Sequence, residues 1–164
     1  ADQVAQLYTG WIQDELRAHP DAVVLMPLLN LDELWGPSYK GVNSVMQPIF
    51  HIVGRANIDP ARVYLMGHAM SGHATWNLAL HYPTFFAAIN PMAGSASQPW
   101  QRLRMGNLRN VFAVVWHDEQ DPLVKVEASR QLVKILQNLK HNNVDYEETK
   151  GVGHAPSDEI LARV

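Results

Sequence analysis

The chain has 164 residues, of which 47% are hydrophobic and 18% are charged, with a formal net charge of −3. This length allows one domain with a sizeable core, and the composition excludes a disordered tail. The weak charge, without runs of like sign, excludes an extended nucleic-acid or polybasic membrane surface, and the absence of cysteine excludes disulfides, thiolate metal sites and a cysteine nucleophile.

The N-terminal residues 1–4 carry no basic start and lead into no apolar run, so we expect no leader peptide. They also lack an initiator methionine, which indicates a processed, trimmed or incomplete N-terminus. No apolar stretch reaches the length that a bilayer-spanning helix needs. We therefore expect a soluble protein without a membrane span, with the cytoplasm favoured as its location.

Two periodicities alternate along the chain. Apolar residues at helical spacing predict a helix over residues 2–18, and the short apolar run 22–26 predicts a buried strand. Residues 28–40 are loop-like. Helical spacing resumes over 41–56, where Pro48 inside the pattern predicts either a kink or a later start.

The next part of the chain contains two predicted strands. Residues 62–66 form the first, followed by a sharp turn over 67–72 and a helix over 73–81. The second strand is expected over 86–90. A stretch rich in Gly, Ser and Pro, residues 91–99, then predicts a loop.

The C-terminal part repeats the alternation. A β-branched buried strand is expected over 111–116, an amphipathic helix over 128–139, an alternating strand over 144–149 and a short helix from Ala155. These strands are too uniformly apolar to have one face in water. The fold class is therefore α/β, a mostly parallel sheet with helices on both faces, and residues 1–164 form a single domain.

Polar residues gather directly after three of the predicted strands, at 67–72, 117–122 and 151–156. In an open parallel sheet, active groups collect at the carboxyl ends of the strands. We therefore expect the chemistry of this protein to lie where these three segments meet.

These segments make the chain similar to the α/β-hydrolase superfamily, particularly its carboxylesterase, phospholipase-like and predicted-peptidase branches. Residues 58–68, IDPARVYLMGH, resemble the approach to the nucleophile elbow of that family. Residues 75–79, TWNLA, followed by Tyr82-Pro83 and Phe86-Ala87-Ala88, resemble what comes after the elbow. The order of elbow, acid and histidine along the chain is also the order of that fold.

The resemblance assigns roles to individual residues. Asp121 matches the triad acid and His154 the general base, while the backbone N–H of Met70 would donate one oxyanion-hole hydrogen bond. Ala69 occupies the position of the nucleophilic serine. Ser71 stands where the G-x-S-x-G pattern has its second glycine.

Alanine has no group that attacks a carbonyl, so the acyl-enzyme route is closed in this sequence. Ser71 is a poor substitute, because two helical residues turn its side chain by about 200° from that of residue 69, toward the packed flank of the elbow. Ala69 is then a natural loss or an engineered knockout. Both Ala69 and Ser71 depart from the G-x-S-x-G pattern within one turn, and this pair of changes favours natural loss.

Other polar residues have simpler interpretations. His117 and Asp118 are expected to form a polar cluster at a strand end rather than a ligand pair. His68 and His73 lack a His-Glu-x-x-His arrangement, so no metal site is expected. His68 and Trp35 are candidates for the wall of the substrate cleft.

The family also places a strand before its first helix, and the loop after that strand supplies a second oxyanion donor. This chain begins at the helix, and the absent strand would lie between the strands expected at 22–26 and 62–66. An unpaired strand edge inside a protein is costly. We expect an N-terminally incomplete domain whose sheet is completed by a missing segment or by a partner chain.

The resemblance implies a serine hydrolase of carboxylesterase type, which cleaves acyl esters or peptides with a Ser-His-Asp triad and needs no cofactor or metal. The chain would be inactive because position 69 is alanine. The alternative is a non-catalytic binding or scaffolding module on a degenerate hydrolase fold. Direct activation of water by His154 is a third, less favoured route.

Overall fold

The computed structural model describes residues 2–27 and 39–163. Its centre is one sheet of four strands in the order β1-β2-β3-β4, and all three neighbouring pairs are parallel. The strands are β1 (Tyr64–His68), β2 (Ala88–Met92), β3 (Phe112–Asp118) and β4 (Val144–Thr149). Their carboxyl ends therefore lie at one edge of the sheet.

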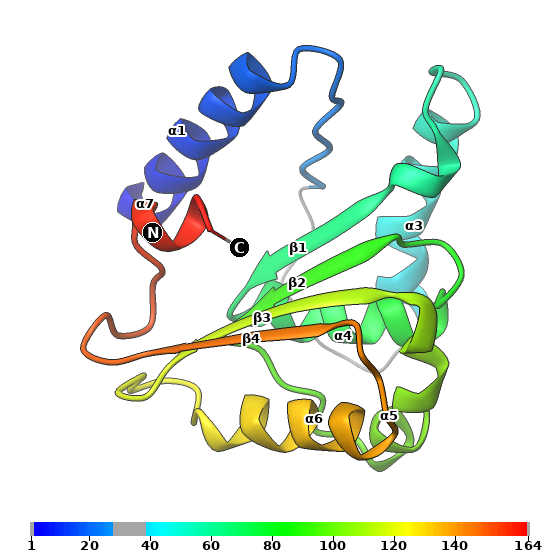
Figure 1. Cartoon of the computed structure of the whole chain (residues 1–164). Helices are drawn as coiled ribbons and strands as arrows, with labels where there is room; N and C mark the ends of the chain where they lie inside the picture. The colour runs from blue at the N-terminus through cyan, green and yellow to red at the C-terminus, as the bar shows by residue number, and fades with distance from the viewer. Residues whose placement is uncertain (1, 28–38, 164) are drawn as a thin grey trace.

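Helices cover both faces of the sheet, as the sequence predicted. They are α1 (Asp2–Ala18), α3 (Tyr39–Val53), α4 (Met70–His81), α5 (Pro99–Leu103), α6 (Glu127–Asn138) and α7 (Asp158–Leu161), with 3₁₀ helices η1 (Pro60–Arg62) and η2 (Met105–Asn110). Figure 1 shows α4 and α6 on one side of the sheet and α1 and α7 on the other. The α/β fold class is thereby confirmed.

The hydrophobic core has two parts. The larger part lies between the sheet and helices α3, α4 and α6, and the fully buried Trp76 is one of its largest side chains. The smaller part contains Met92 and Trp116 with Ile160 and Leu161 of α7, and Trp11 of α1 packs against it. This second cluster fixes α1 and α7 over the carboxyl half of the sheet, next to the strand ends.

The strand predicted over residues 22–26 is wrong. The segment has no regular secondary structure, and Val23 and Met26 are 56% and 58% exposed. A strand needs the backbone groups of a neighbour to satisfy its own, and no strand of the described residues pairs with this segment. Apolar composition alone therefore did not specify its structure.

Several boundaries differ from the prediction for local reasons. The carboxylate of Asp59 accepts a hydrogen bond from the Ala61 N–H at 2.9 Å, which starts η1. Because Pro60–Arg62 curl into this 3₁₀ turn, β1 begins two residues later than expected and extends through His68. Helix α4 then begins at Met70, so the expected turn over 67–72 contracts to a single residue.

The other differences lie at element ends and in the second loop. Strand β2 lies two residues later than the expected 86–90, and β4 matches its prediction over 144–149. Pro48 lies inside α3, which begins before it, so the later start is wrong. The expected loop over 91–99 ends in α5, which begins at Pro99 with a capping box of Gln98 and Gln101, and η2 follows it.

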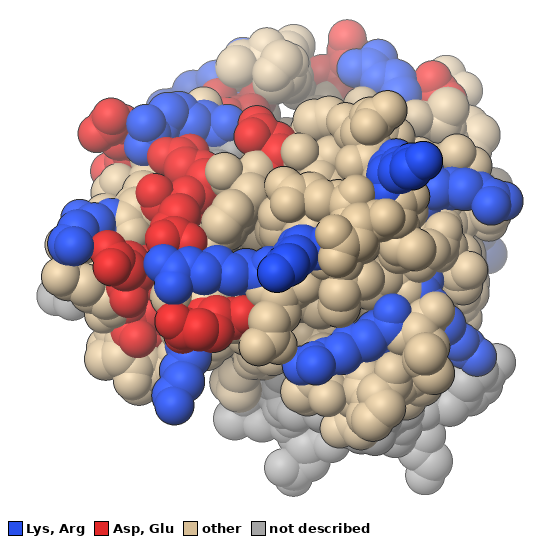
Figure 2. Space-filling view, turned by 60° about the horizontal axis from the view of Figure 1, so that its bottom comes forward, with Lys and Arg blue, Asp and Glu red and all other residues tan. Residues whose placement is uncertain are grey.

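Figure 2 shows Lys and Arg interleaved with Asp and Glu over the face turned forward from the bottom of Figure 1, with acidic residues concentrated to one side. Arg130 of α6 makes ion pairs with Glu148 of β4 at 2.6 Å and with Glu127 at 3.2 Å. The pair with Glu148 lowers the pKa of that carboxyl to about 2. These contacts join α6 to β4.

Among the described residues, no helix combines the length and the apolar character that crossing a membrane requires.

The start of α4 lies against the chain that follows β2. A Cβ atom on Gly72 would stand 2.5 Å from the Met92 carbonyl oxygen and 3.0 Å from Cα of Gly94. Both distances lie below van der Waals contact, so only glycine fits at position 72. The first turn of α4 can therefore sit directly on the ends of β1 and β2.

This contact predicts opposite effects for two Gly→Ala substitutions. Gly72→Ala should lower the free energy of unfolding by about 1–3 kcal/mol, because the added methyl group overlaps backbone. Gly10→Ala, in the middle of α1 with nothing within 4 Å, should raise it by about 0.5–1 kcal/mol. Urea unfolding followed by circular dichroism measures both, and equal stability of the Gly72 variant and the parent would contradict the close packing.

Candidate active site

Ala69 forms the sharp turn between β1 and α4. Its backbone angles are φ 56° and ψ −116°, a conformation that costs a non-glycine residue about 1–3 kcal/mol. The turn is held from both sides, because the Ala69 N–H donates to the Met92 carbonyl at 2.9 Å and its carbonyl accepts from the His73 N–H at 3.0 Å. Strain of this kind is found mainly at functional sites.

Met70 and Ser71, which follow Ala69, differ in their places at the start of α4. Met70 is the first residue of α4, where backbone N–H groups have no acceptor within the helix and can bind an anion. Ser71 was expected to face the packed flank of the elbow, but it is exposed. That detail of the prediction is wrong, because the packed flank belongs to Gly72.

The structure brings Asp121 and His154 together, although 33 residues separate them. Nδ1 of His154 lies 2.7 Å from Oδ2 of Asp121, and the His154 side chain is 20% exposed while that of Asp121 is fully buried. Asp121 follows β3, and His154 follows β4 in a loop where Gly151 and Gly153 have φ near +83° and +84°. Glycine allows the loop to turn back toward the acid.

The Asp121 carboxylate is saturated with donors. Besides His154, it accepts the backbone N–H groups of Leu123 at 2.8 Å and Val124 at 3.0 Å through Oδ1. Burial alone would raise the pKa of Asp121, but the hydrogen bonds from Val124, His154 and Leu123 outweigh it and lower that pKa. Asp121 is therefore ionised at neutral pH and holds the proton of His154 on Nδ1, which leaves Nε2 as the free ring nitrogen.

His117 and Asp118 form the polar cluster expected at the end of β3, and both are fully buried. His117 lies between Ser129 of α6 and the Asp121 turn: Nδ1 is 2.7 Å from the Ser129 hydroxyl, and Nε2 is 2.9 Å from the Val124 carbonyl and 3.3 Å from Oδ2 of Asp121. The two triad-like residues thus have a third polar side chain behind them.

Asp118 anchors the loop that contains His154. Its carboxylate accepts the Thr149 hydroxyl at 2.9 Å, the Val152 N–H at 3.0 Å and the Gln120 N–H at 2.9 Å. Burial would raise its pKa, but hydrogen bonds from Gln120, Val152 and Thr149 lower it. The same buried carboxylate therefore links the end of β3 to the histidine loop.

His68, expected in the cleft wall, contacts His154 directly. Its Nε2 lies 2.6 Å from the His154 backbone carbonyl, and the two ring centroids are 4.7 Å apart. Because a carbonyl only accepts, Nε2 of His68 donates this bond. Burial is the largest effect on His68 and lowers its pKa, which favours the neutral ring. Since His68 directly precedes Ala69, this contact joins the elbow to the histidine loop.

A second Ser–His pair lies beside the elbow. Nδ1 of His73 is 3.0 Å from the Ser95 hydroxyl, but it also accepts the Ser95 backbone N–H at 2.6 Å. A ring nitrogen whose lone pair is occupied by a backbone donor is a poor base for the hydroxyl. This pair therefore fastens the loop after β2 to α4.

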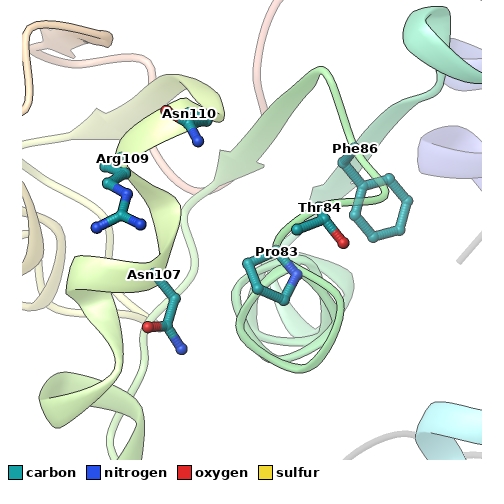
Figure 3. A pocket seen from close by; sticks show the side chains of 6 residues that line it. All are labelled: Pro83, Thr84, Phe86, Asn107, Arg109 and Asn110. Carbon is teal, nitrogen blue, oxygen red and sulfur yellow. The ribbon is translucent and has the colours of Figure 1, made fainter.

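The surface also has a hollow of about 370 Å³ lined by Pro83, Thr84, Phe86, Asn107, Arg109 and Asn110 (Figure 3). These residues precede β2 and β3, so the hollow lies at the amino ends of the strands, away from Asp121 and His154. It forms no part of the candidate site. Trp35, the other cleft candidate, lies outside the described residues.

Within residues 2–27 and 39–163, no group of three or more His, Asp or Glu side chains is placed to hold a metal ion. Sequence reasoning missed Ser129 and Thr149 as partners of the buried cluster. For Ser129 a signal was present, because it lies three and four residues before the buried Leu132 and Val133, on the apolar face of α6. No comparable signal marked Thr149.

No family model and no curated protein matches the chain. Among solved structures, a thermostable esterase is 32% identical to this chain with a TM-score of 0.63. The match covers 69% of this chain and 29% of the esterase. SOBER1 of Arabidopsis thaliana is 18% identical with a TM-score of 0.64, and the match covers 75% of this chain and 59% of SOBER1. A puromycin-hydrolysing peptidase of Mycobacterium tuberculosis has 15% identity, 80% and 24% coverage and a TM-score of 0.69. The chain spans less than two thirds of each.

The anchoring role of Asp118 predicts a pH-dependent stability. Its folded-state pKa lies below the ordinary value, so its contribution is present above that value, about 3.9, and is lost as the pH falls through the lowered pKa. Asp118→Asn should therefore destabilise the protein by about 1–3 kcal/mol at pH 7 and flatten the loss of stability below pH 4.

Urea unfolding between pH 7 and pH 2 measures this effect. Glu119→Gln is the matched control, since Glu119 is the next residue but its side chain is 44% exposed and pairs with Lys150 at 3.1 Å. The control should follow the parent closely, because exposed ion pairs contribute little. An Asp118 variant with the acid profile of the parent would refute the anchoring role.

Proposed function

We propose that this chain, which belongs to the α/β-hydrolase superfamily, is a serine-hydrolase domain of carboxylesterase type that is disabled at its nucleophile. The single observation on which the proposal depends is the 2.7 Å contact between the buried Asp121 carboxylate and Nδ1 of His154. It is the arrangement by which a triad acid orients its base.

The conformation of Ala69 supports the same function. The strained turn with φ 56° comes directly after β1, and the residue before it, His68, contacts the histidine loop. Alanine gains nothing from this strain, whereas a serine there would be exposed to substrate. The thermostable esterase, at 32% identity, further favours acyl esters as the substrate class.

With serine at position 69 the chemistry proceeds in two balanced stages. The serine Oγ attacks the ester carbonyl while Nε2 of His154 takes its proton and later gives it to the leaving alkoxide. Water then attacks the acyl carbonyl while Nε2 of His154 takes a proton from it. The acyl–Oγ bond breaks, the serine Oγ receives that proton from Nε2, and the carboxylic acid is released. Asp121 stabilises the imidazolium formed in each stage, and the Met70 N–H donates to the developing oxyanion.

With Ala69 no acyl-enzyme can form, so the chain as it stands is an inactive hydrolase. The alternative function is a non-catalytic binding or scaffolding module, and Ala69 itself favours it. Retention of the Asp121–His154 pair favours the disabled enzyme, because a binding module has no physical need for a polarised imidazole. Direct water activation by His154 stays a minor third proposal.

Restoring the nucleophile tests the proposal. Ala69→Ser, alone and with Ser71→Gly, should hydrolyse a short-chain p-nitrophenyl ester, while the parent chain should not. Adding Asp121→Asn should lower kcat by about ten-thousandfold, because the acid no longer fixes the tautomer of His154. Release of p-nitrophenol measured at 405 nm provides the rate.

Adding His154→Ala to the serine variant is the control, and it should abolish the recovered activity. If folded serine variants show no hydrolysis, or if hydrolysis persists without His154, the disabled-enzyme proposal is wrong. The binding or scaffolding module then becomes the better description.

A further inference from the structure

We propose that His117 is a positioning residue that orients Asp121 from behind, so that one carboxylate oxygen serves two imidazoles. The inference rests on the proposed function, because it assigns His117 to the same acid–base pair. It goes beyond that function, since neither the triad pattern nor the comparisons give His117 a role.

The geometry determines which nitrogen of His117 is protonated. Nε2 faces the Val124 carbonyl at 2.9 Å and Oδ2 of the ionised Asp121 at 3.3 Å. Both groups only accept hydrogen bonds, so Nε2 must have the proton. The Nε2–H group therefore donates to the Val124 carbonyl and lies beside Oδ2 of Asp121, the oxygen that His154 contacts at 2.7 Å.

Ser129 fixes the other side of the ring. Its hydroxyl lies 2.7 Å from Nδ1 of His117 and 3.3 Å from the Gly94 carbonyl. When the hydroxyl donates to Nδ1, His117 is neutral with its proton on Nε2; when it donates to Gly94, the ring is protonated on both nitrogens. In either state an N–H group of His117 faces Asp121.

The consequence for Asp121 is geometric. Val124 donates to Oδ1 of Asp121 and accepts from His117, so the turn over 121–124 is closed by the histidine. The side chains of both His117 and Asp121 are 0% exposed, so water cannot replace a lost donor. Without the ring, the carboxylate would lose a polar N–H neighbour at 3.3 Å, and its turn would lose the hydrogen bond that holds the Val124 carbonyl.

Two substitutions separate positioning from mere packing. Gln at position 117 places an amide N–H near the position of Nε2, whereas Asn reaches only toward Ser129. In the Ala69→Ser background, His117→Asn should lower kcat by up to about a hundredfold with little change in KM, as expected for a displaced acid. His117→Gln should recover a large part of that loss. If His117 only fills space, the Gln variant should not be more active than the Asn variant.

Nitrogen-15 NMR of the parent chain gives a readout that needs no activity. His117 should show protonated Nε2, and neutral His154 should show protonated Nδ1 and unprotonated Nε2. His117→Asn should mix the two tautomers of His154, and His117→Gln should not. Spectra of His154→Ala and His117→Gln assign the two rings.

The outcomes are distinct. If Nε2 of His117 is unprotonated in the parent chain, the proposal is wrong. This result needs no substitution, so the proposal can be tested even if a variant fails to fold. A folded His117→Asn protein with unchanged kcat and an unchanged His154 tautomer overturns it as well. If the tautomer of His154 depends on residue 117 but the serine variant hydrolyses nothing, His117 keeps its positioning role and the proposed function fails.

Discussion

The packing of Gly72 against Gly94 is the constraint on which the site depends. Only two glycines allow the first turn of α4 to touch the backbone after β2, and this contact places the N-terminus of the helix over the strand ends. The short distance forces the chain to reverse within one residue, which is the origin of the strained backbone at Ala69. Larger side chains would separate the helix from the sheet and relax the turn.

A circuit of successive polar contacts leads from Gly94 through the strand ends back to the residue before Ala69. The Gly94 carbonyl accepts from Ser129, which contacts His117, and His117 reaches Oδ2 of Asp121. Asp121 holds His154, whose carbonyl accepts from His68, the residue before Ala69. Because each member is fixed by the next, the geometry of the acid–base pair is set by packing among four strand ends rather than by one loop.

The sequence predicted the alternation of strands and helices and the meeting of Asp121 with His154, since parallel strands bring their carboxyl ends to one edge. It did not predict the exposure of segment 22–26, because apolar composition cannot report whether a pairing partner is present. It placed β1 two residues early, since the Asp59 cap competes with the strand for Pro60–Arg62. The burial of Ser129 was readable from its place on the apolar face of α6, but its contact with His117 was not, because periodicity identifies a face and not a partner. No periodic signal marked the exposure of Ser71.

The turn at residue 69 is held by its backbone and not by its side chain. Two hydrogen bonds of the Ala69 backbone hold the strained turn, one to the Met92 carbonyl and one from the His73 N–H, and neither needs a serine hydroxyl. The buried circuit behind it likewise contains no atom of residue 69. The contacts that hold Asp121 and His154 are therefore independent of the side chain at position 69, so a substitution there leaves their geometry in place.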